Sequence, residues 1–314
     1  MDAIFLYILL HNYDIIFITI GSDTVDDCIL EIKHLKKYYG NIKGVEDVSI
    51  KLNKGCIYGF IGPNGSGKST TIRTIMGLIN KNSGKIYIDG KEFNRDDIDI
   101  KKKIGYLPSE INLYGDMTVG EILSYHESFY KKTSKRRREL VKLLKIDEKK
   151  KIEDLSFGNL KKVGIVLALL HQPELLILDE PTSGLDPIMQ NTFYEILLDE
   201  KKKGTTILYS THVLSEVSSI CDKIGFIKDG VIIKEDSIEN FFKDNITYLT
   251  ISSNDIESIK KDLKLEIKNE SRNEVTFINN IDINILIKKL SNYKIDKLLI
   301  ENISLEDLFS KYYK

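Results

Sequence analysis

Gly-Pro-Asn-Gly-Ser-Gly-Lys-Ser-Thr occupies residues 62–70 and follows directly on the apolar run Cys-Ile-Tyr-Gly-Phe-Ile at residues 56–61. A stretch of helical character continues from Thr70 to Leu78. The spacing Gly-x-x-x-x-Gly-Lys-Ser is meaningful in this context, because a phosphate-binding loop is built as strand, loop and helix in succession. The stretch therefore predicts such a loop, and the flanks disfavour the alternative of a glycine-rich connection that binds nothing.

The residues of this loop have separate expected roles. Gly62, Gly65 and Gly67 let the backbone curl so that its N–H groups point at phosphate oxygens, and the helix start adds the positive end of its dipole. Lys68 is expected to reach the β- and γ-phosphates, and Ser69 to ligate Mg²⁺. Further contacts to the bound nucleotide are expected from Pro63, Asn64, Ser66 and Thr70.

Bulk composition narrows the classes of function. A chain of 314 residues with 42% apolar residues is long enough for two packed domains. Its formal net charge of −1 argues against a nucleic-acid partner, which would require a basic surplus. The basic cluster at residues 135–138 is short, so a solvated helix face is favoured over a lipid or RNA patch. The cysteines, Cys28, Cys56 and Cys221, have no metal-site spacing and suit a reducing cytosol.

Residues 1–27 are expected to be an extension of uncertain structure. Two apolar runs, 3–10 and 15–20, are split by His-Asn-Tyr-Asp, and neither reaches the ~20 residues that span a bilayer. No Lys or Arg precedes Lys33, so the basic start of a signal peptide is missing. An irregular or packed extension is favoured; an upstream stretch included by a misplaced start and a membrane anchor are the alternatives.

Strand and helix patterns alternate through residues 28–240, which favours an α/β fold. The runs at 175–178 and 206–209 are continuously apolar, as in parallel strands buried on both faces. A helical pattern at 187–203 lies between them and ends at Gly204, and the segment 101–172 resembles a helical insertion in which Thr118 begins a helix. Further strand patterns, one of them followed by an Asp89-Gly90 turn signal, lie at residues 28–32, 48–52, 56–61 and 85–88.

A boundary is expected near residues 240–245, and residues 241–314 are expected to be a small α+β accessory domain. Short strand patterns occur at 246–251, 265–268, 275–278 and 295–300, together with two helices. A capping-box pattern at Ser304 and Asp307 predicts a final helix with apolar residues on one face. No cluster of catalytic residue types is found in this segment.

Two carboxylates end the apolar strand pattern at 175–178. Mg²⁺ prefers oxygen ligands, so Asp179 at the strand tip is a candidate ligand. Glu180 could then accept a proton from the attacking water in phosphoryl transfer. Carboxyl ends of neighbouring parallel strands lie at one edge of a sheet, which would bring this pair close to Lys68.

Two further positions are candidates for phosphate contacts. His212 directly follows the strand pattern at 206–209, so a γ-phosphate contact is plausible, although a structural role is the more common one for a single histidine. Ser156 and Gly158 stand at the start of an apolar helix at 160–170 and form a second candidate anion site. Such a site would have a role if it closes on the nucleotide that a second copy of the chain binds.

In this order the motifs resemble those of an ATP-binding cassette (ABC) ATPase, over roughly residues 28–314. The corresponding segments are Walker A at 62–70, the signature at 155–159, Walker B at 175–180, the D-loop at 183–186 and the switch histidine at 212. The resemblance implies a P-loop cassette with an antiparallel β subdomain and a helical subdomain at about 101–172. It also implies ATP and Mg²⁺ as cofactors, adenine stacking by Tyr39, with Tyr38 as a second choice, and a nucleotide contact from Asp186.

The sequence departs from the family pattern at two places. Ser109 stands where the family usually has a glutamine that contacts Mg²⁺ or the attacking water, and a serine could do so only through a bridging water. We therefore expect altered coupling to the membrane partner. In the signature, Phe157 and Asn159 replace the usual glycine and glutamine, while the phosphate-facing residues Ser156 and Gly158 remain.

A single cassette with a small C-terminal module is similar to the ATPase subunits of bacterial exporters of the antibiotic-resistance and sodium-extrusion types. The resemblance implies an integral membrane permease as partner, a second cassette as homodimer or heterodimer, and a peripheral position at the cytoplasmic face of the cell membrane, with membrane contact through the permease. A soluble, non-transport ABC ATPase and a nucleotide-sensing cassette with little turnover are the alternatives.

Overall fold

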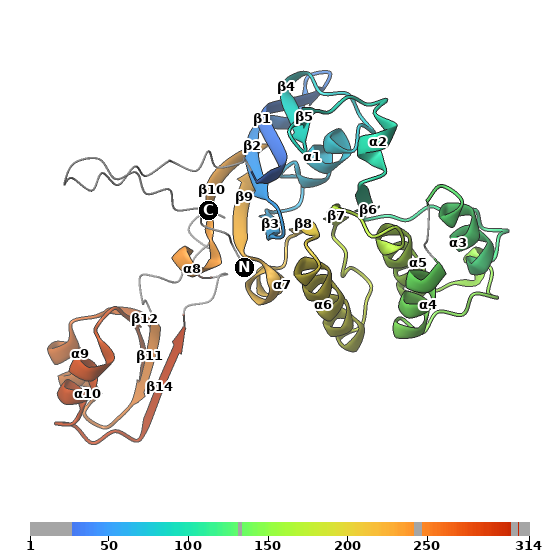
Figure 1. The fold of residues 1–314 in the computed structure, drawn as a ribbon. Helices are drawn as coiled ribbons and strands as arrows, with labels where there is room; N and C mark the ends of the chain where they lie inside the picture. The colour runs from blue at the N-terminus through green and yellow to red at the C-terminus, as the bar shows by residue number, and fades with distance from the viewer. Residues whose placement is uncertain (1–26, 131–133, 242–246, 303–306, 308–314) are drawn as a thin grey trace, which may run out of the picture.

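The protein is described by a computed structural model in residues 27–130, 134–241, 247–302 and 307 (Figure 1). One sheet contains ten strands: β1 (Cys28–Tyr39), β2 (Ile42–Asn53), β3 (Ile57–Ile61), β4 (Ser83–Ile88), β5 (Lys91–Glu92), β6 (Ile104–Leu107), β7 (Leu175–Asp179), β8 (Thr206–Thr211), β9 (Lys223–Lys228) and β10 (Val231–Ser237). Their order is β5-β4-β1-β2-β10-β9-β3-β8-β7-β6. The fold is therefore of the α/β class.

One half of this sheet is antiparallel. β1 pairs with both β2 and β4, and β5 completes a hairpin with β4. Asp89 and Gly90 form the turn of this hairpin with φ angles of +50° and +74°, the positive values that a tight hairpin turn requires. The predicted turn is confirmed. β1 and β2 are longer than the strands predicted at 28–32 and 48–52. The sequence did not predict the added residues as strand, because they lack a clear apolar alternation.

The other half of the sheet is parallel and buried on both faces. β6, β7, β8, β3 and β9 lie side by side in this order and run parallel to one another, whereas β9 pairs antiparallel with β10 on its other side. In β3, Ile57 and Ile61 pack into one apolar core, whereas Tyr58 and Phe60 pack into the other. This alternation explains the continuously apolar strands, since successive side chains point to opposite faces and both faces are covered.

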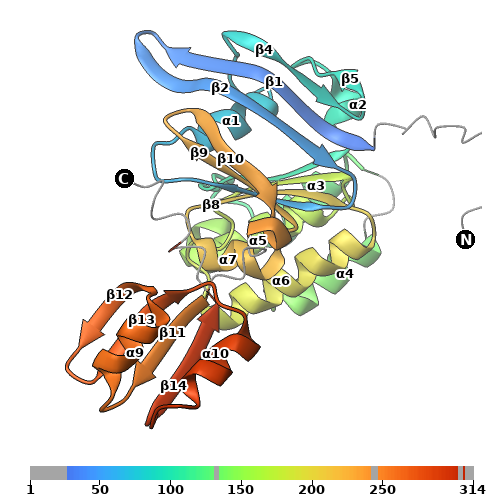
Figure 2. The same cartoon turned by 90° about the vertical axis from the view of Figure 1, so that its left-hand side faces the viewer.

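Helices cover the two faces of the parallel half. α1 (Lys68–Ile75) lies between it and the antiparallel strands, and α6 (Pro187–Lys202) and α7 (Leu214–Ile220) cover the opposite face (Figure 2). Asp186 caps α6 and Pro187 is its first residue; Gly204, with a φ of +97°, follows its end. The predicted limits of this helix are confirmed to within one residue.

A group of helices extends to one side of the sheet (Figure 1). It consists of α3 (Val119–Glu127), α4 (Ser134–Leu143), the short helix η1 (Ile152–Asp154) and α5 (Phe157–Leu169). Thr118 begins α3 with a capping box, as predicted. The helical segment predicted at 101–172 starts too early, because it contains β6, an edge strand that pairs with β7. Only four residues long, β6 has too short a pattern to be recognised from sequence.

The basic cluster at residues 135–138 differs from its prediction as a solvated face. Lys135 and Arg138 are exposed, but Arg136 and Arg137 are largely buried. Arg136 forms an ion pair with buried Glu200 of α6. The ion pairs that turn both arginines inward are long-range, so the local charge pattern could not reveal them.

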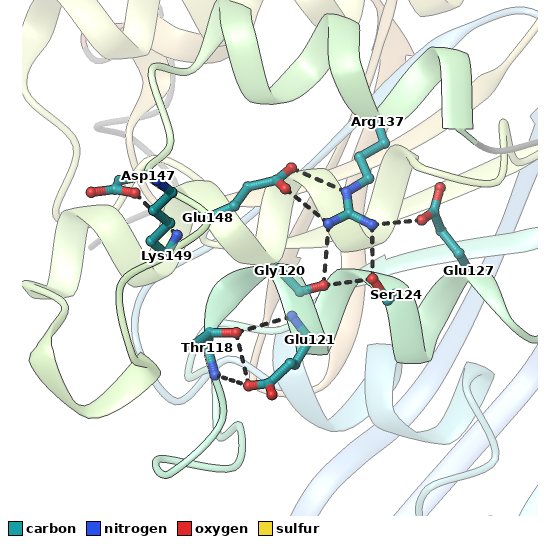
Figure 3. Close-up of polar contacts among 9 residues, drawn as sticks. All are labelled: Thr118, Gly120, Glu121, Ser124, Glu127, Arg137, Asp147, Glu148 and Lys149. Carbon is teal, nitrogen blue, oxygen red and sulfur yellow. Dashed lines mark hydrogen bonds and ion pairs between the residues drawn. The ribbon is translucent and has the colours of Figure 1, made fainter.

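Arg137 joins the segments of the helical group. Its guanidinium donates to Glu148 at 3.0 and 2.9 Å, to Glu127 at 2.8 Å and to the carbonyl of Gly120 at 3.1 Å (Figure 3). The fork geometry of arginine suits such multiple acceptors. One side chain thus fixes α4 to α3 and to the loop that follows α4.

The C-terminal module is a separate four-stranded sheet with two helices. It contains β11 (Thr247–Ser252), α9 (Ile256–Leu263), β12 (Glu266–Ser271), β13 (Glu274–Asn279), α10 (Ile283–Leu290) and β14 (Lys297–Asn302). The antiparallel order β12-β13-β11-β14 and the succession β-α-β-β-α-β are those of a ferredoxin-like fold. Leu249, Phe277 and Ile259 belong to a core of its own. The predicted α+β character is confirmed.

Some predictions fall outside the described residues. These are the extension at 1–26 and the helix predicted from Ser304, of which only Asp307 is described, in an ion pair with Lys268. Among the helices of the described ranges, none combines the length and the apolar character that a bilayer span requires.

Candidate functional site

A pocket of about 620 Å³ lies where several strands of the ten-stranded sheet end. The loops after β3, β6, β7 and β8 contribute to it, together with the end of β1. This is the sheet edge that the sequence predicted. The predicted residues that line the pocket are Tyr39, Asn64, Gly65, Gly67, Lys68, Ser69, Thr70, Ser109, Glu180 and His212.

The loop after β3 has the backbone of an anion cradle. Gly65 and Gly67 have φ angles of +81° and +105°, a region that residues with a side chain rarely adopt. A Cβ atom at Gly62 would lie 2.2 Å from the carbonyl oxygen of Ile227. Gly67 is the N-cap of α1 and supplies no side-chain cap, so the first amides of that helix are available to a phosphate. The loop therefore fits a triphosphate.

Lys68 is the cation of this cradle. Its side chain is 5% exposed, and its ammonium donates to the carbonyls of Gly62 at 2.6 Å and Pro63 at 3.2 Å. Burial lowers the pKa of Lys68, an effect that the charges of Glu180 and Asp179 oppose. The Lys68 ammonium lies 3.6 Å from Glu180, so the loop after β3 and the end of β7 form one site.

Asp179 has the features of a metal ligand. It is 1% exposed at the tip of β7, and its Oδ2 atom is buried without a hydrogen-bond partner. Its Oδ1 atom accepts from the hydroxyl of Ser210 at 3.3 Å, and the nearby Ser69 hydroxyl lowers the pKa of the carboxyl. Burial raises the pKa of Asp179. A buried carboxylate oxygen in need of a partner, close to a serine hydroxyl, fits a hard divalent cation such as Mg²⁺.

Glu180 and His212 form a pair at the pocket. Nδ1 of His212 donates to the Glu180 carboxylate at 2.9 Å. Glu180 has a φ of +48°, an uncommon conformation for a residue with a long side chain. Its backbone N–H donates to the carbonyl of Ser210 at 3.0 Å, which binds this strained residue to β8. The strain turns the chain at the strand end and lets the carboxylate reach both Lys68 and His212.

The signature residues occupy the start of α5. Ser156 is the N-cap of α5 and accepts from the backbone N–H of Asn159 at 3.4 Å. The observed helix therefore begins at Phe157, three residues before the start of the helix predicted at 160–170. A Cβ atom at Gly184 would lie 2.2 Å from the Phe157 ring, so this ring packs directly on the D-loop. Phe157 also lines the pocket.

Some predicted residues do not line the pocket of their own chain. Ser156 and Gly158 lie at the start of α5, and Asp186 accepts a hydrogen bond from the N–H of Met189 as the cap of α6. In the cradle loop, Gly62 and Ser66 are buried and Pro63 is half-buried. Asp179 lies at the tip of the neighbouring strand.

Sequence reasoning missed Lys161 of α5. It is 1% exposed, and its ammonium donates to the carbonyls of Pro108 at 3.3 Å and Ser109 at 3.1 Å. Burial lowers the pKa of Lys161 to about 8, against the charges of Asp179 and Glu180. The signal available was its place among apolar residues on an otherwise buried helix.

Known proteins are similar to this chain. The sequence model of the family described as "ABC transporter" matches residues 45–183. The linearmycin resistance ATP-binding protein LnrL of Bacillus subtilis is 38% identical, over 71% of this chain and 75% of its own length. The lantibiotic transport ATP-binding protein SrtF of Streptococcus pyogenes is also 38% identical, over 70% of this chain and 98% of its own.

Solved structures are similar as well. The structure of an ATP-binding subunit of an ABC transporter superposes with a TM-score of 0.64 at 30% identity and covers 69% of this chain and 93% of its own. The dimeric structure of a bacterial ABC transporter cassette gives a TM-score of 0.62 at 26% identity and covers 67% and 99%. The cradle, the buried carboxylate and these likenesses agree: the chain belongs to the ATP-binding proteins of ABC transporters and is an ATP-hydrolysing cassette.

Proposed function

We propose that this chain is the ATPase subunit of a bacterial exporter. It binds an integral membrane permease at the cytoplasmic face of the cell membrane, as a peripheral subunit whose membrane contact is made through that permease. Support comes from the similar proteins, whose names concern linearmycin resistance, lantibiotic transport and, for BcrA of Bacillus licheniformis at 36% identity, bacitracin transport. The proposed cargo class is therefore antibiotics.

The observation that carries the ATPase role is the convergence of three ionisable groups at one sheet edge. Lys68 lies 3.6 Å from Glu180, and His212 lies 2.9 Å from Glu180 on its other carboxylate oxygen. In hydrolysis Glu180 accepts the proton of the attacking water, and Lys68 holds charge on the β- and γ-phosphates. His212 orients the Glu180 carboxylate and contacts the γ-phosphate.

Ser69 and Asp179 would hold Mg²⁺. The hydroxyl of Ser69 and the unpartnered Oδ2 of Asp179 are the oxygens available for it. When bound, Mg²⁺ supplies charge neutralisation on the β- and γ-phosphate oxygens. Ser109 lines the same pocket and contributes through a bridging water, because its side chain is shorter than the glutamine of other cassettes.

Tyr39 and the cradle loop bind the rest of the ATP molecule. The Tyr39 ring is 45% exposed at the pocket, and the ammonium of Lys37 lies 4.9 Å from its centroid. An exposed aromatic face of this kind offers a stacking surface for adenine. The amides of residues 62–70 hold the phosphates, with Asn64, Ser66 and Thr70 completing the loop.

A second cassette, identical or related, completes the site. Ser156 caps α5 with its hydroxyl at the start of the helix, where the dipole favours an anion. Ser156 and Gly158 of one copy close on the ATP held by the other, and Asp186 lies in the loop between the two sites. Closure moves the permease, and hydrolysis separates the cassettes. The dimeric solved relative supports this arrangement.

Phosphate release by the purified chain tests the proposal, with and without membranes that contain the permease. Glu180→Gln is expected to bind ATP, to lose about 10²–10⁴ in hydrolysis rate and to accumulate as a dimer with Mg·ATP. The membranes are expected to alter the rate of the wild type. Wild-type turnover in Glu180→Gln would contradict the base assignment, and a rate indifferent to the membranes would contradict the transport role.

A further inference from the structure

A buried glutamate of α7 binds the loop that follows Glu180 and the end of β8 that precedes His212. Glu216 is 8% exposed and belongs to none of the motifs described above. One of its carboxylate oxygens accepts from the Thr182 hydroxyl at 2.6 Å. The other accepts from the Thr211 hydroxyl at 2.8 Å and from the Tyr209 phenol at 3.0 Å. Three hydroxyls, one from the loop after β7 and two from the end of β8, thus converge on one carboxylate.

The residues that Glu216 holds are close neighbours of the pair along the chain. Thr182 follows Glu180 by two residues, within the turn in which the Ser183 N–H donates to the Glu180 carbonyl at 3.4 Å. Thr211 directly precedes His212. The Thr211 hydroxyl that donates to Glu216 also accepts from the N–H of Val213 at 3.0 Å, so it fixes the backbone on both sides of His212.

The donors around Glu216 suit a side chain that accepts hydrogen bonds on both oxygens. All three partners donate, and an ionised carboxylate is the side chain that only accepts. Hydrogen bonds to a charged acceptor are shorter and stronger than neutral ones, and the 2.6 Å distance from the Thr182 hydroxyl lies in that shorter range. Burial, with the charge of Glu216, raises the pKa of the Tyr209 phenol well above its ordinary value, so this group remains a donor.

We propose that Glu216 is a positioning residue for ATP hydrolysis. It sets the distance between the loop after β7 and the loop after β8, and so keeps Glu180 and His212 in contact. The inference rests on the proposed roles of Glu180 and His212. The competing explanation is that Glu216 stabilises the fold alone and has no influence on the rate.

The test compares variants that remove single hydroxyls with variants that keep them. Thr182→Val and Thr211→Val are nearly isosteric and delete one donor each, whereas Thr182→Ser and Thr211→Ser retain it. Thr250→Val of the C-terminal module is the matched control, because Thr250 is likewise buried and bonds to Thr276 at 2.9 Å. Steady-state phosphate release gives kcat and KM, and thermal melting reports folding.

The valine variants and Glu216→Gln are expected to lower kcat about tenfold with KM for ATP within about twofold, because a misplaced group costs rate. The serine variants are expected to recover most of the wild-type kcat, and the control to match it. Thr182→Val combined with Thr211→Val tests whether the effects are coupled, as a shared carboxylate requires. If Glu216→Gln does not fold, the threonine variants still test the inference.

Two results would overturn the inference: folded valine variants with wild-type kcat, or serine variants that lose as much rate as the valine variants. A wild-type chain that hydrolyses ATP, together with a Glu180→Gln variant that does not, would leave the proposed function intact in either case. Failure of the wild type itself to hydrolyse ATP would count against the proposed function rather than against Glu216 alone.

Discussion

The cassette and the C-terminal module both place helices on a sheet, but they treat buried polar groups differently. The parallel half of the cassette buries charged side chains, among them Lys68, Lys161 and Asp179. In the described part of the module, the buried polar residues are neutral: Thr250, Ser253 and Asn279. Buried charge is costly unless it is paired or used. The contrast indicates where the chemistry lies, and why a parallel sheet, whose loops meet at one edge, is its scaffold.

The largest expected effect tests whether the module is independent of that chemistry. Phe277 is fully buried in the core of the module, so Phe277→Ala is expected to destabilise the module by about 3–5 kcal/mol. Because this core contains no cassette residue, ATP hydrolysis should persist. Hydrogen exchange would measure the loss, with exposed Leu298→Ala as control. If Phe277→Ala also abolished ATP hydrolysis, the module would not be independent of the catalytic site.

The second prediction compares a lysine of the cassette with a lysine of the C-terminal module. Lys68→Met removes the cation of the cradle and is expected to lower the hydrolysis rate by about 10²–10³, the usual cost of deleting one charge-stabilising donor. Lys268 of the module lies over the Tyr248 ring and pairs with Asp307, and Lys268→Met should leave the rate unchanged. A phosphate-release assay on both variants decides the point. Equal losses would show that the module takes part in hydrolysis.

A third prediction concerns acid stability. Burial lowers the pKa of His171 from 6.5 to about 4, and the neighbouring His126 is lowered for the same reason. The unfolded chain therefore binds protons that the folded chain does not. Stability should be highest above pH 6.5 and fall by up to about 3 kcal/mol as the pH drops towards 4.

His171→Gln should flatten this dependence, measured by urea unfolding at several pH values. Exposed His34→Gln is the control, because its ring lies in solvent on β1. The module has no histidine in residues 241–314, so its own unfolding should lack this slope. A slope that persists in the cassette of the His171→Gln variant would contradict the assignment.

The smallest effect is expected at Ser109. In the proposed mechanism its hydroxyl acts through a bridging water, so Ser109→Ala is expected to change hydrolysis by only about two- to threefold. Coupled transport in membranes with the permease should change at least as much as ATP hydrolysis. The Lys161 ammonium donates to the backbone carbonyl of Ser109, and Ser109→Ala leaves this contact unchanged. The loop itself should therefore stay in place. If neither rate changes, Ser109 has no role in coupling.

Much of the parallel core followed from the sequence because its signals are local. The apolar runs became strands buried on both faces, and the loop glycines took the positive φ angles that the motif requires. Asp179, Glu180 and His212 were placed at one edge because parallel strands share their polarity. These predictions needed only periodicity, turn chemistry and strand direction.

What the sequence did not reveal depends on partners far along the chain. Arg136 is turned inward by Glu200, sixty-four positions away, and Lys161 by carbonyls that precede it by about fifty residues. Glu216 likewise gathers donors from the loop after β7 and from β8. Arg136 and Glu216 look like ordinary surface charges in their local context, whereas Lys161 stands among apolar residues; the partners of all three are brought to them by the fold.

The contact between Phe157 and Gly184 has a practical consequence. The chain contains no tryptophan, so Phe157→Trp would create a single indole at the rim of the pocket, half exposed against the D-loop. Its emission would report, without added dye, how the environment of that rim changes when nucleotide or another subunit arrives. A position that departs from the family pattern thus becomes a built-in place to observe the working cycle in real time.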